Sequence, residues 1–227
     1  MSAAMIERAQ RGLRRFGLAG IATRAAALAG RSISRTLYLQ ERHIWYALDL
    51  TEARPRPELP GGFTLHQASD TDLPLLEQLQ TIGGVEAAQR HRDGADLWLV
   101  QAEGQPAFAC WIFLKRAPVL AARGGWLPLP AATACLEDSV TASLYRGRGL
   151  AAAAWSAIAD DLAQRGIKTL ITKVAEDNTA SRRAVEKVGF VPTALMSLTR
   201  LAMRAHVDVY PYRENAVFAF LEGVLSR

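Results

Sequence analysis

Residues 135–204 set the strictest condition on the fold, because strand and helix patterns alternate along them with short connections. A run of alanines from Ala151 predicts the first helix, which Gly166 ends, and Asn178 is the expected cap of the second helix. In order, the predicted elements are a strand over 135–143, a helix to about Gln164, a strand over 168–176, a helix over 178–190 and a strand over 191–204. This order requires a sheet whose strands are connected through helices.

Shorter elements are predicted before this region. The predicted elements are strands over 43–50 and 62–68, a helix over 69–79 and a β-hairpin over 95–116. A proline-rich stretch before residue 60 marks a boundary. The expected fold class is α+β, with a mixed, mostly antiparallel sheet flanked by helices. The expected division is an N-terminal helix and strand over 1–60, a main domain over 61–203 and a C-terminal extension over 204–227.

The turn between the strand over 135–143 and its helix has the composition of an anion site. It reads YRGRGLAAAAW, with Gly147 and Gly149 each preceded by an arginine, Arg146 and Arg148. Glycines permit a tight turn, and the free N–H groups and positive dipole end of a helix N-terminus attract phosphate. The arginines add charges that stay protonated. The turn therefore predicts a phosphate-bearing ligand.

Two familiar phosphate-binding patterns are less favoured here, one because its residues are absent and the other because its fold needs more chain. The GxxxxGK[ST] pattern of nucleotide-binding P-loops is absent, because no lysine follows the glycines at the required place. Gly147, Gly149 and Ala152 do satisfy the dinucleotide pattern GxGxxA, and Glu176 or Asp177 lies at about the right distance for a ribose. A dinucleotide fold needs further strand–helix units, for which the remaining chain leaves little room.

A third pattern, R-x-x-G-x-A, is met by Arg146, Gly149 and Ala151. Together with LEDSVTASLYRGRGLA and NTASRRAVEKVGF, it makes residues 136–190 resemble the core of the GNAT family of N-acyltransferases. The resemblance implies a donor, acetyl-coenzyme A or another acyl-coenzyme A. It implies pyrophosphate contacts from the backbone of Gly147, Arg148, Gly149, Leu150 and Ala151, and pantetheine contacts from Asn178 and Ser181.

Acyl transfer to an amine needs a base, a donor to the oxyanion and a proton for the leaving thiolate. Glu137 is the preferred base and Asp138 the fallback, and strand alternation lets at most one of them enter the cleft directly. The resemblance implies an oxyanion contact from a backbone N–H near Val140 or Thr141. Where the family commonly has a tyrosine as proton donor, this chain has Val185. Water, Ser181 or Tyr145 are the alternatives.

The net charge of +5 is concentrated near the N-terminus. Residues 1–36 hold seven arginines and one glutamate, which leaves the other residues near −1. Three interpretations of this basic, amphipathic segment stay open: a helix packed on its own domain, peripheral contact with an anionic membrane such as the inner membrane, and an organelle-targeting sequence. Nucleic acid is not an expected partner of the main body.

The remaining composition bounds the cellular setting. Only Cys110 and Cys135 are present, each in an apolar strand, so buried packing is expected rather than covalent catalysis or a disulfide framework. The four histidines are scattered, which predicts no metal site. No run approaches the ~20 apolar residues of a membrane span. A cytoplasmic protein is expected.

The sequence therefore predicts an acyl-coenzyme A-dependent N-acyltransferase, with acetyl as the first acyl group to consider and a small-molecule primary amine as acceptor. Two alternatives stay open: a coenzyme A-binding or interaction module without turnover, and an enzyme that takes its acyl group from acyl carrier protein. Monomer and homodimer are both open. The acceptor side is expected among the helices around 70–93, the loop over 123–131 and the stretch over 206–220.

Overall fold

The computed structural model describes residues 38–79, 82–201 and 204–226. The basic segment at 1–36, with its predicted helix, lies outside the described residues. The described residues divide into two units, the first with 38–41, 198–201 and 204–206 and the second with 42–79, 82–197 and 207–226. Every residue of the site described below belongs to the second unit.

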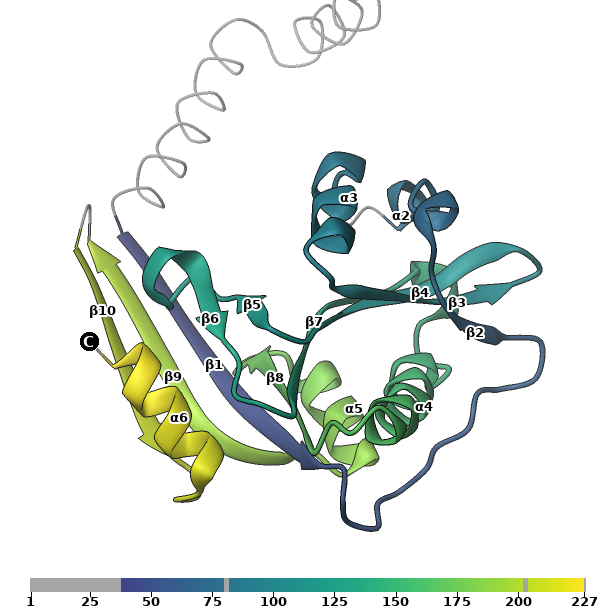
Figure 1. The fold of residues 1–227 in the computed structure, drawn as a ribbon. Coiled ribbons are helices and arrows are strands. Elements are labelled where there is room, and N and C mark those ends of the chain that lie inside the picture. Colours follow the sequence, from purple (N-terminus) through teal and green to yellow (C-terminus); the bar gives the residue numbers. More distant parts are fainter. Residues whose placement is uncertain (1–37, 80–81, 202–203, 227) are drawn as a thin grey trace, which may run out of the picture. The chain divides into compact units, whose positions relative to one another are not determined.

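An eight-stranded sheet has the order β10-β9-β1-β8-β7-β4-β3-β2, and a separate two-stranded sheet joins β5 and β6 (Figure 1). The strands are β1 (Tyr38–Asp49), β2 (Thr64–Gln67), β3 (Asp96–Ala102), β4 (Gln105–Phe113), β5 (Arg116–Pro118), β6 (Trp126–Pro128), β7 (Thr133–Thr141), β8 (Thr169–Ala175), β9 (Val191–Leu201) and β10 (Arg204–Pro211). β7 and β8 pair in parallel, whereas β1–β8, β2–β3, β3–β4 and β4–β7 are antiparallel. The α+β class with a mixed, mostly antiparallel sheet is confirmed.

The helices are α2 (Leu75–Gln78), α3 (Gly84–Arg92), α4 (Leu150–Gln164), α5 (Thr179–Val188) and α6 (Ala216–Leu225), with 3₁₀ turns at Asp70–Asp72, Arg123–Gly125 and Ser143–Tyr145. The helix predicted over 69–79 is wrong in form, because it is split into a 3₁₀ turn and α2. Pro74 separates the two pieces. The first piece is capped at Ser69, whose backbone N–H donates to the carboxylate of Asp72.

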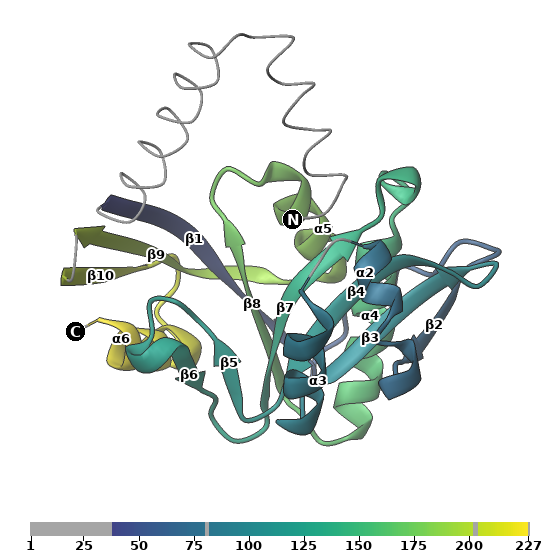
Figure 2. The ribbon, with the colours of Figure 1, turned by 90° about the horizontal axis from the view of Figure 1, so that it is seen from above.

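Two helix layers cover the two faces of the neighbouring strands β8, β7, β4, β3 and β2. Figures 1 and 2 place α2 and α3 on one face and α4 and α5 on the other. Alternation along β4 accounts for this division. Phe108, Cys110 and Ile112 belong to the buried cluster that includes α4, whereas Trp111 and Phe113 lie beneath Arg90 of α3.

The predicted N-terminal strand is a strand of the main sheet. β1 pairs with β8 from His43↔Ala175 to Asp49↔Thr169. Strands from all three predicted segments, 1–60, 61–203 and 204–227, therefore occur in the order of one sheet. The segment 206–220, expected near the acceptor, forms part of β10 and the start of α6, which buries Phe218 and Leu221.

Candidate active site

The site begins where two parallel strands separate. β7 and β8 are paired from Thr133↔Thr169 to Leu136↔Thr172, and Thr172 Oγ1 donates to the Leu136 carbonyl at 2.8 Å. Both strands continue past this point without a further pairing between them. Residues 137–141 of β7 and 173–175 of β8 line two cavities there.

The larger cavity, of about 590 Å³, is lined by the glycine turn, the first turn of α4 and one face of α5. Gly147 and Gly149 have φ values of +77° and +79°, in the left-handed region that favours glycine. A Cβ at either position would meet nothing within 4 Å, so the backbone angle, not lack of space, accounts for the glycines.

The N-terminus of α4 presents open hydrogen-bond donors. Gly149 is the N-cap and supplies no side-chain cap, and the first intrahelical bond runs from Ala153 N to Gly149 O. The N–H groups of Leu150, Ala151 and Ala152 precede that bond, so they have no partner within the helix. With the helix dipole, they suit an anionic group.

Basic side chains reach the larger cavity from two elements. Arg146 lines it, although its Nε donates to the Thr141 carbonyl at 3.2 Å. Arg183 and Lys187, one helical turn apart on α5, also line it. Arg148 does not belong to the lining, and its guanidinium lies 5.5 Å from the centre of the Tyr145 ring. The other predicted cofactor-binding residues, Val140, Thr141, Gly147, Gly149, Leu150, Ala151, Asn178 and Ser181, all line this cavity.

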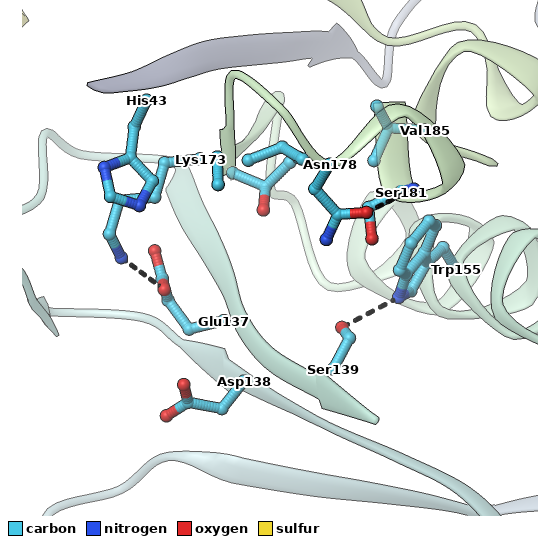
Figure 3. Close-up of a pocket in the computed structure, with 12 residues that line it drawn as sticks. His43, Glu137, Asp138, Ser139, Trp155, Lys173, Asn178, Ser181 and Val185 are labelled. Atoms are coloured by element: carbon cyan, nitrogen blue, oxygen red, sulfur yellow. Dashed lines mark hydrogen bonds and ion pairs between the residues drawn. The ribbon is translucent and has the colours of Figure 1, made fainter. Parts of the chain in front are cut away.

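A smaller cavity of about 290 Å³ adjoins the first, because both are lined by Ser139, Trp155, Asn178 and Ser181 (Figure 3). Trp155 Nε1 of α4 donates to Ser139 Oγ of β7 at 3.2 Å, which fixes the indole at the junction. Asn178 caps α5 as predicted, accepting from Ser181 N at 3.1 Å. The junction is therefore held by a hydrogen bond from α4 to β7 and by the N-terminal cap of α5.

Glu137 lies in the smaller cavity and forms an ion pair with Lys173 (Figure 3). Its side chain is only 8% exposed. Burial raises the pKa of the Glu137 carboxyl, and the charge of Lys173 opposes part of that rise. Burial by itself lowers the pKa of Lys173, but the charge and hydrogen bond of Glu137, together with the nearby Cys135 and Asp138, more than offset it, so the pKa of Lys173 is raised. Lys173 therefore keeps its proton at neutral pH.

Asp138 lines the same cavity as Glu137, which strand alternation does not predict. β4 and β7 pair at Ala109↔Val140 and at Trp111↔Glu137, so Asp138 and Ser139 together oppose Cys110 in a β-bulge. Asp138 has a φ of +49°. The expectation that at most one of the two carboxylates enters the cleft directly is wrong, because the bulge interrupts the alternation.

Arg90 of α3 holds the carboxylate of Asp138. Its Nη1 lies 2.5 Å from Asp138 Oδ2, and its Nη2 lies 2.7 Å from Glu86 Oε1. The guanidinium is 5.5 Å from the ring centres of both Trp111 and Phe113, and its side chain is 9% exposed. A buried, stacked arginine therefore connects α3 to the bulge.

The candidates for the proton donor occupy different places. Val185, at the position of the family tyrosine, is buried and lines the smaller cavity, whereas Tyr145 lines the larger one. Ser181 lines both. Cys110 and Cys135 are fully buried, and burial raises the pKa of each thiol, which keeps both protonated.

Sequence reasoning missed Lys173 and His43, which line the smaller cavity, and Arg90 behind it. A lysine inside the apolar strand over 168–176 was the signal available for Lys173. Pairing of β1 with β8 brings His43 to the site, and no local pattern shows that pairing. Among the described residues, none from 70–93, 123–131 or 206–220 lines either cavity.

Comparisons with known proteins agree with this geometry. The family model described as the Acetyltransferase (GNAT) family matches residues 73–190. A GCN5-related N-acetyltransferase from Sphaerobacter thermophilus is 17% identical with a TM-score of 0.54, and the match covers 82% of this chain and 58% of that one. A second, from Kribbella flavida, is 13% identical with a TM-score of 0.51, covering 83% and 65%.

These two likenesses concern the fold, and the chain spans less than two thirds of the length of either protein. No curated protein matches the sequence. Within the part of the chain that the structure describes, no helix has the length and apolarity needed to cross a membrane. Those residues also contain no group of three or more His, Cys, Asp and Glu side chains placed to hold a metal ion.

Proposed function

The chain belongs to the GNAT family of acetyltransferases, and we propose that it transfers an acyl group, acetyl in the first instance, from coenzyme A to a primary amine of a small molecule. The observation that carries this proposal is the pair of adjoining cavities. The larger one has helix N–H donors and basic side chains, and the smaller one has a buried carboxylate.

The donors and charges that line the larger cavity suit the phosphate groups of coenzyme A. The N–H groups at the start of α4, with Arg183 and Lys187, match a pyrophosphate. Asn178 and Ser181 lie at the junction, where the pantetheine arm would pass on its way to the smaller cavity. The thioester would then lie between β7 and β8, where the two strands are no longer paired.

The residues of β7 supply the chemistry of the transfer. Glu137 accepts the proton that the acceptor ammonium must lose, directly or through one water molecule. A backbone N–H near Val140 or Thr141 donates to the carbonyl oxygen as negative charge develops on it. The amine forms the new C–N bond and the C–S bond breaks. The second proton of the attacking nitrogen passes, through water or the Ser181 hydroxyl, to the departing thiolate, which leaves as the thiol.

Two measurements on the purified full-length chain test this proposal. Isothermal titration with coenzyme A and acetyl-coenzyme A is expected to give saturable binding. A thiol-release assay with acetyl-coenzyme A and a panel of primary amines is expected to show turnover that depends on the amine. Binding without turnover for every amine would instead support a coenzyme A-binding module. A lack of binding would refute coenzyme A as the donor.

A further inference from the structure

The smaller cavity carries charges of opposite sign on its two walls. The β7 wall holds the carboxylates of Glu137 and Asp138, and the β8 wall holds the ammonium of Lys173 (Figure 3). His43 of β1 lies beside Lys173. The register pairs His43 with Ala175 and Trp45 with Lys173, so His43 and Lys173 occupy the same face of the sheet. The ring of Trp45, 5.8 Å from Lys173 Nζ, lies on that face.

The charges around the cavity are balanced in pairs. Glu137 is paired with Lys173, and Asp138 is paired with Arg90 from outside the lining. A ligand with net charge would add an uncompensated charge to a partly buried space, which is costly. A ligand that carries one positive and one negative group adds no net charge and can exchange partners with the Glu137–Lys173 pair.

Both members of that pair keep hydrogen-bonding capacity. Lys173 has three N–H donors and gives one to Glu137. Glu137 accepts from Lys173 at Oε2, and among the described residues its donor at Oε1 is the weak Sγ of Cys135, at 3.6 Å. A ligand ammonium can therefore reach Glu137 while a ligand carboxylate reaches Lys173 and His43.

We propose that the acceptor is an α-amino acid, whose amine faces Glu137 and whose carboxylate binds to Lys173 and His43. This inference rests on the proposed function and names the substrate class of the same site. A cavity of about 290 Å³ is at the lower limit of ligand pockets, which suits an acceptor of this size. The arrangement places the nucleophilic nitrogen beside its base and holds the other end of the molecule by charge.

The test compares each proteinogenic amino acid with its α-amide in the thiol-release assay with acetyl-coenzyme A. The amide keeps the amine and the side chain but has no carboxylate. For the amino acid that reacts fastest, kcat/KM is expected to exceed that of its amide by about 10-fold or more, because a charge-assisted hydrogen bond is lost. Calorimetric titration of that amino acid into the coenzyme A complex gives a readout independent of turnover, and the amide is expected to bind more weakly by a similar factor.

Variants of Lys173 and His43, which are proposed to bind the carboxylate, sharpen the comparison. Lys173→Gln is expected to reduce the acid-to-amide ratio to within about threefold of one. Because both substrates use the same base, the ratio removes any general effect on catalysis. Lys168→Gln, an exposed lysine that precedes β8 and lies outside the cavity lining, is the matched control and leaves the ratio unchanged. If Lys173→Gln does not fold, His43→Gln gives the same test, with a smaller fall expected.

Three outcomes overturn the inference. The first is equal use of acids and amides, and the second is turnover with simple amines but with no amino acid. The third is a kcat/KM that is about 10-fold or more higher with succinyl-coenzyme A than with acetyl-coenzyme A, if Lys173→Gln abolishes the difference. Lys173 and His43 would then bind the carboxylate of the donor. Failure of coenzyme A itself to bind in the calorimeter refutes the proposed function instead, so the two failures are distinguishable.

Discussion

A single residue, Asp138, breaks the strand alternation that the sequence predicts for β7. It has a positive φ within a bulge of β7, and the bulge places two consecutive acidic residues in the lining of one cavity. The two carboxylates differ in environment. Glu137 is buried against Lys173, whereas Asp138 is 43% exposed and paired with Arg90. Burial raises the pKa of Glu137, which suits the role of a base near neutral pH.

Glu137→Gln tests that role. Glutamine keeps the volume and still accepts a hydrogen bond from Lys173, so the fold is expected to persist. We expect kcat to fall by about 10²–10³-fold, with the dissociation constant of coenzyme A within about twofold of the wild type. Glu176→Gln is the control, because Glu176 follows β8, pairs with Arg42 and does not line the cavities. Unchanged turnover in Glu137→Gln would remove Glu137 from the role of base.

The pH profile of kcat provides a second test of the same residue. A carboxyl group accepts a proton only when it is deprotonated, so activity falls as the pH drops through the pKa of Glu137. Because burial raises this pKa above 4.5, the acidic limb is expected above the pH of an ordinary glutamate. The limb is expected to disappear in Glu137→Gln. An unchanged acidic limb in that variant would assign the titration to another group.

At the scale of elements, β7, the glycine turn and α4 act as one unit. The strand ends in the bulge, Gly147 and Gly149 turn the chain, and the uncapped start of α4 presents its N–H groups to the larger cavity. α5 completes the site with Asn178 at its N-terminus. The strand, turn and helix are predictable from residue types, because glycine and alanine act through their own backbone preferences and asparagine caps a helix with its own side chain.

Gly149→Ala and Gly166→Ala form a matched pair. The two glycines have φ values of +79° and +83°, and a Cβ at either would meet nothing within 4 Å. Each alanine is expected to lower the free energy of unfolding by about 1–2 kcal/mol through backbone strain. Only Gly149→Ala is expected to weaken coenzyme A binding, by about 10-fold, because it disturbs the N–H donors of the turn. Equal affinities in the two variants would contradict phosphate binding at this turn.

The helix caps give a second pair, Asn178→Ala and Asn215→Ala. Asn178 Oδ1 accepts from Ser181 N at 3.1 Å, and Asn215 Oδ1 accepts from Phe218 N at 2.8 Å. Loss of either cap is expected to cost about 1 kcal/mol in thermal unfolding. Only Asn178 lines the cavities, so only Asn178→Ala is expected to raise the KM for acetyl-coenzyme A, by about three- to tenfold. A raised KM in Asn215→Ala would mean that the effect comes from lost stability.

At the scale of the whole molecule, the site depends on pairings between distant segments. β1 pairs with β8, which brings His43 beside Lys173, and α3 reaches the bulge through Arg90. Coenzyme A binding to the folded chain is therefore expected to raise its free energy of unfolding. At about 100 times its dissociation constant a ligand adds ~2.7 kcal/mol, which corresponds to a rise of about 5–10 °C in Tm for this chain length.

The control ligand for this thermal shift is NAD, because Gly147, Gly149 and Ala152 also satisfy a dinucleotide pattern. We expect a shift with coenzyme A and acetyl-coenzyme A and none with NAD. A shift with NAD alone would contradict the assignment of the larger cavity.

The sequence alone determined the order of strands and helices around the site, the glycine turn, the cap of α5 and the choice of Glu137 and Asp138 as candidate bases. The elements, the turn and the cap depend on local residue preferences and on periodicity over a few residues, whereas the two candidate bases were chosen from their place before the glycine turn and from the resemblance to the GNAT family. Only the tertiary structure decided the partners of the two carboxylates: Lys173 is 36 residues from Glu137, and Arg90 is 48 residues from Asp138. Such pairs form because strand pairing and burial bring distant charges together, and no local pattern in the chain specifies which charges meet.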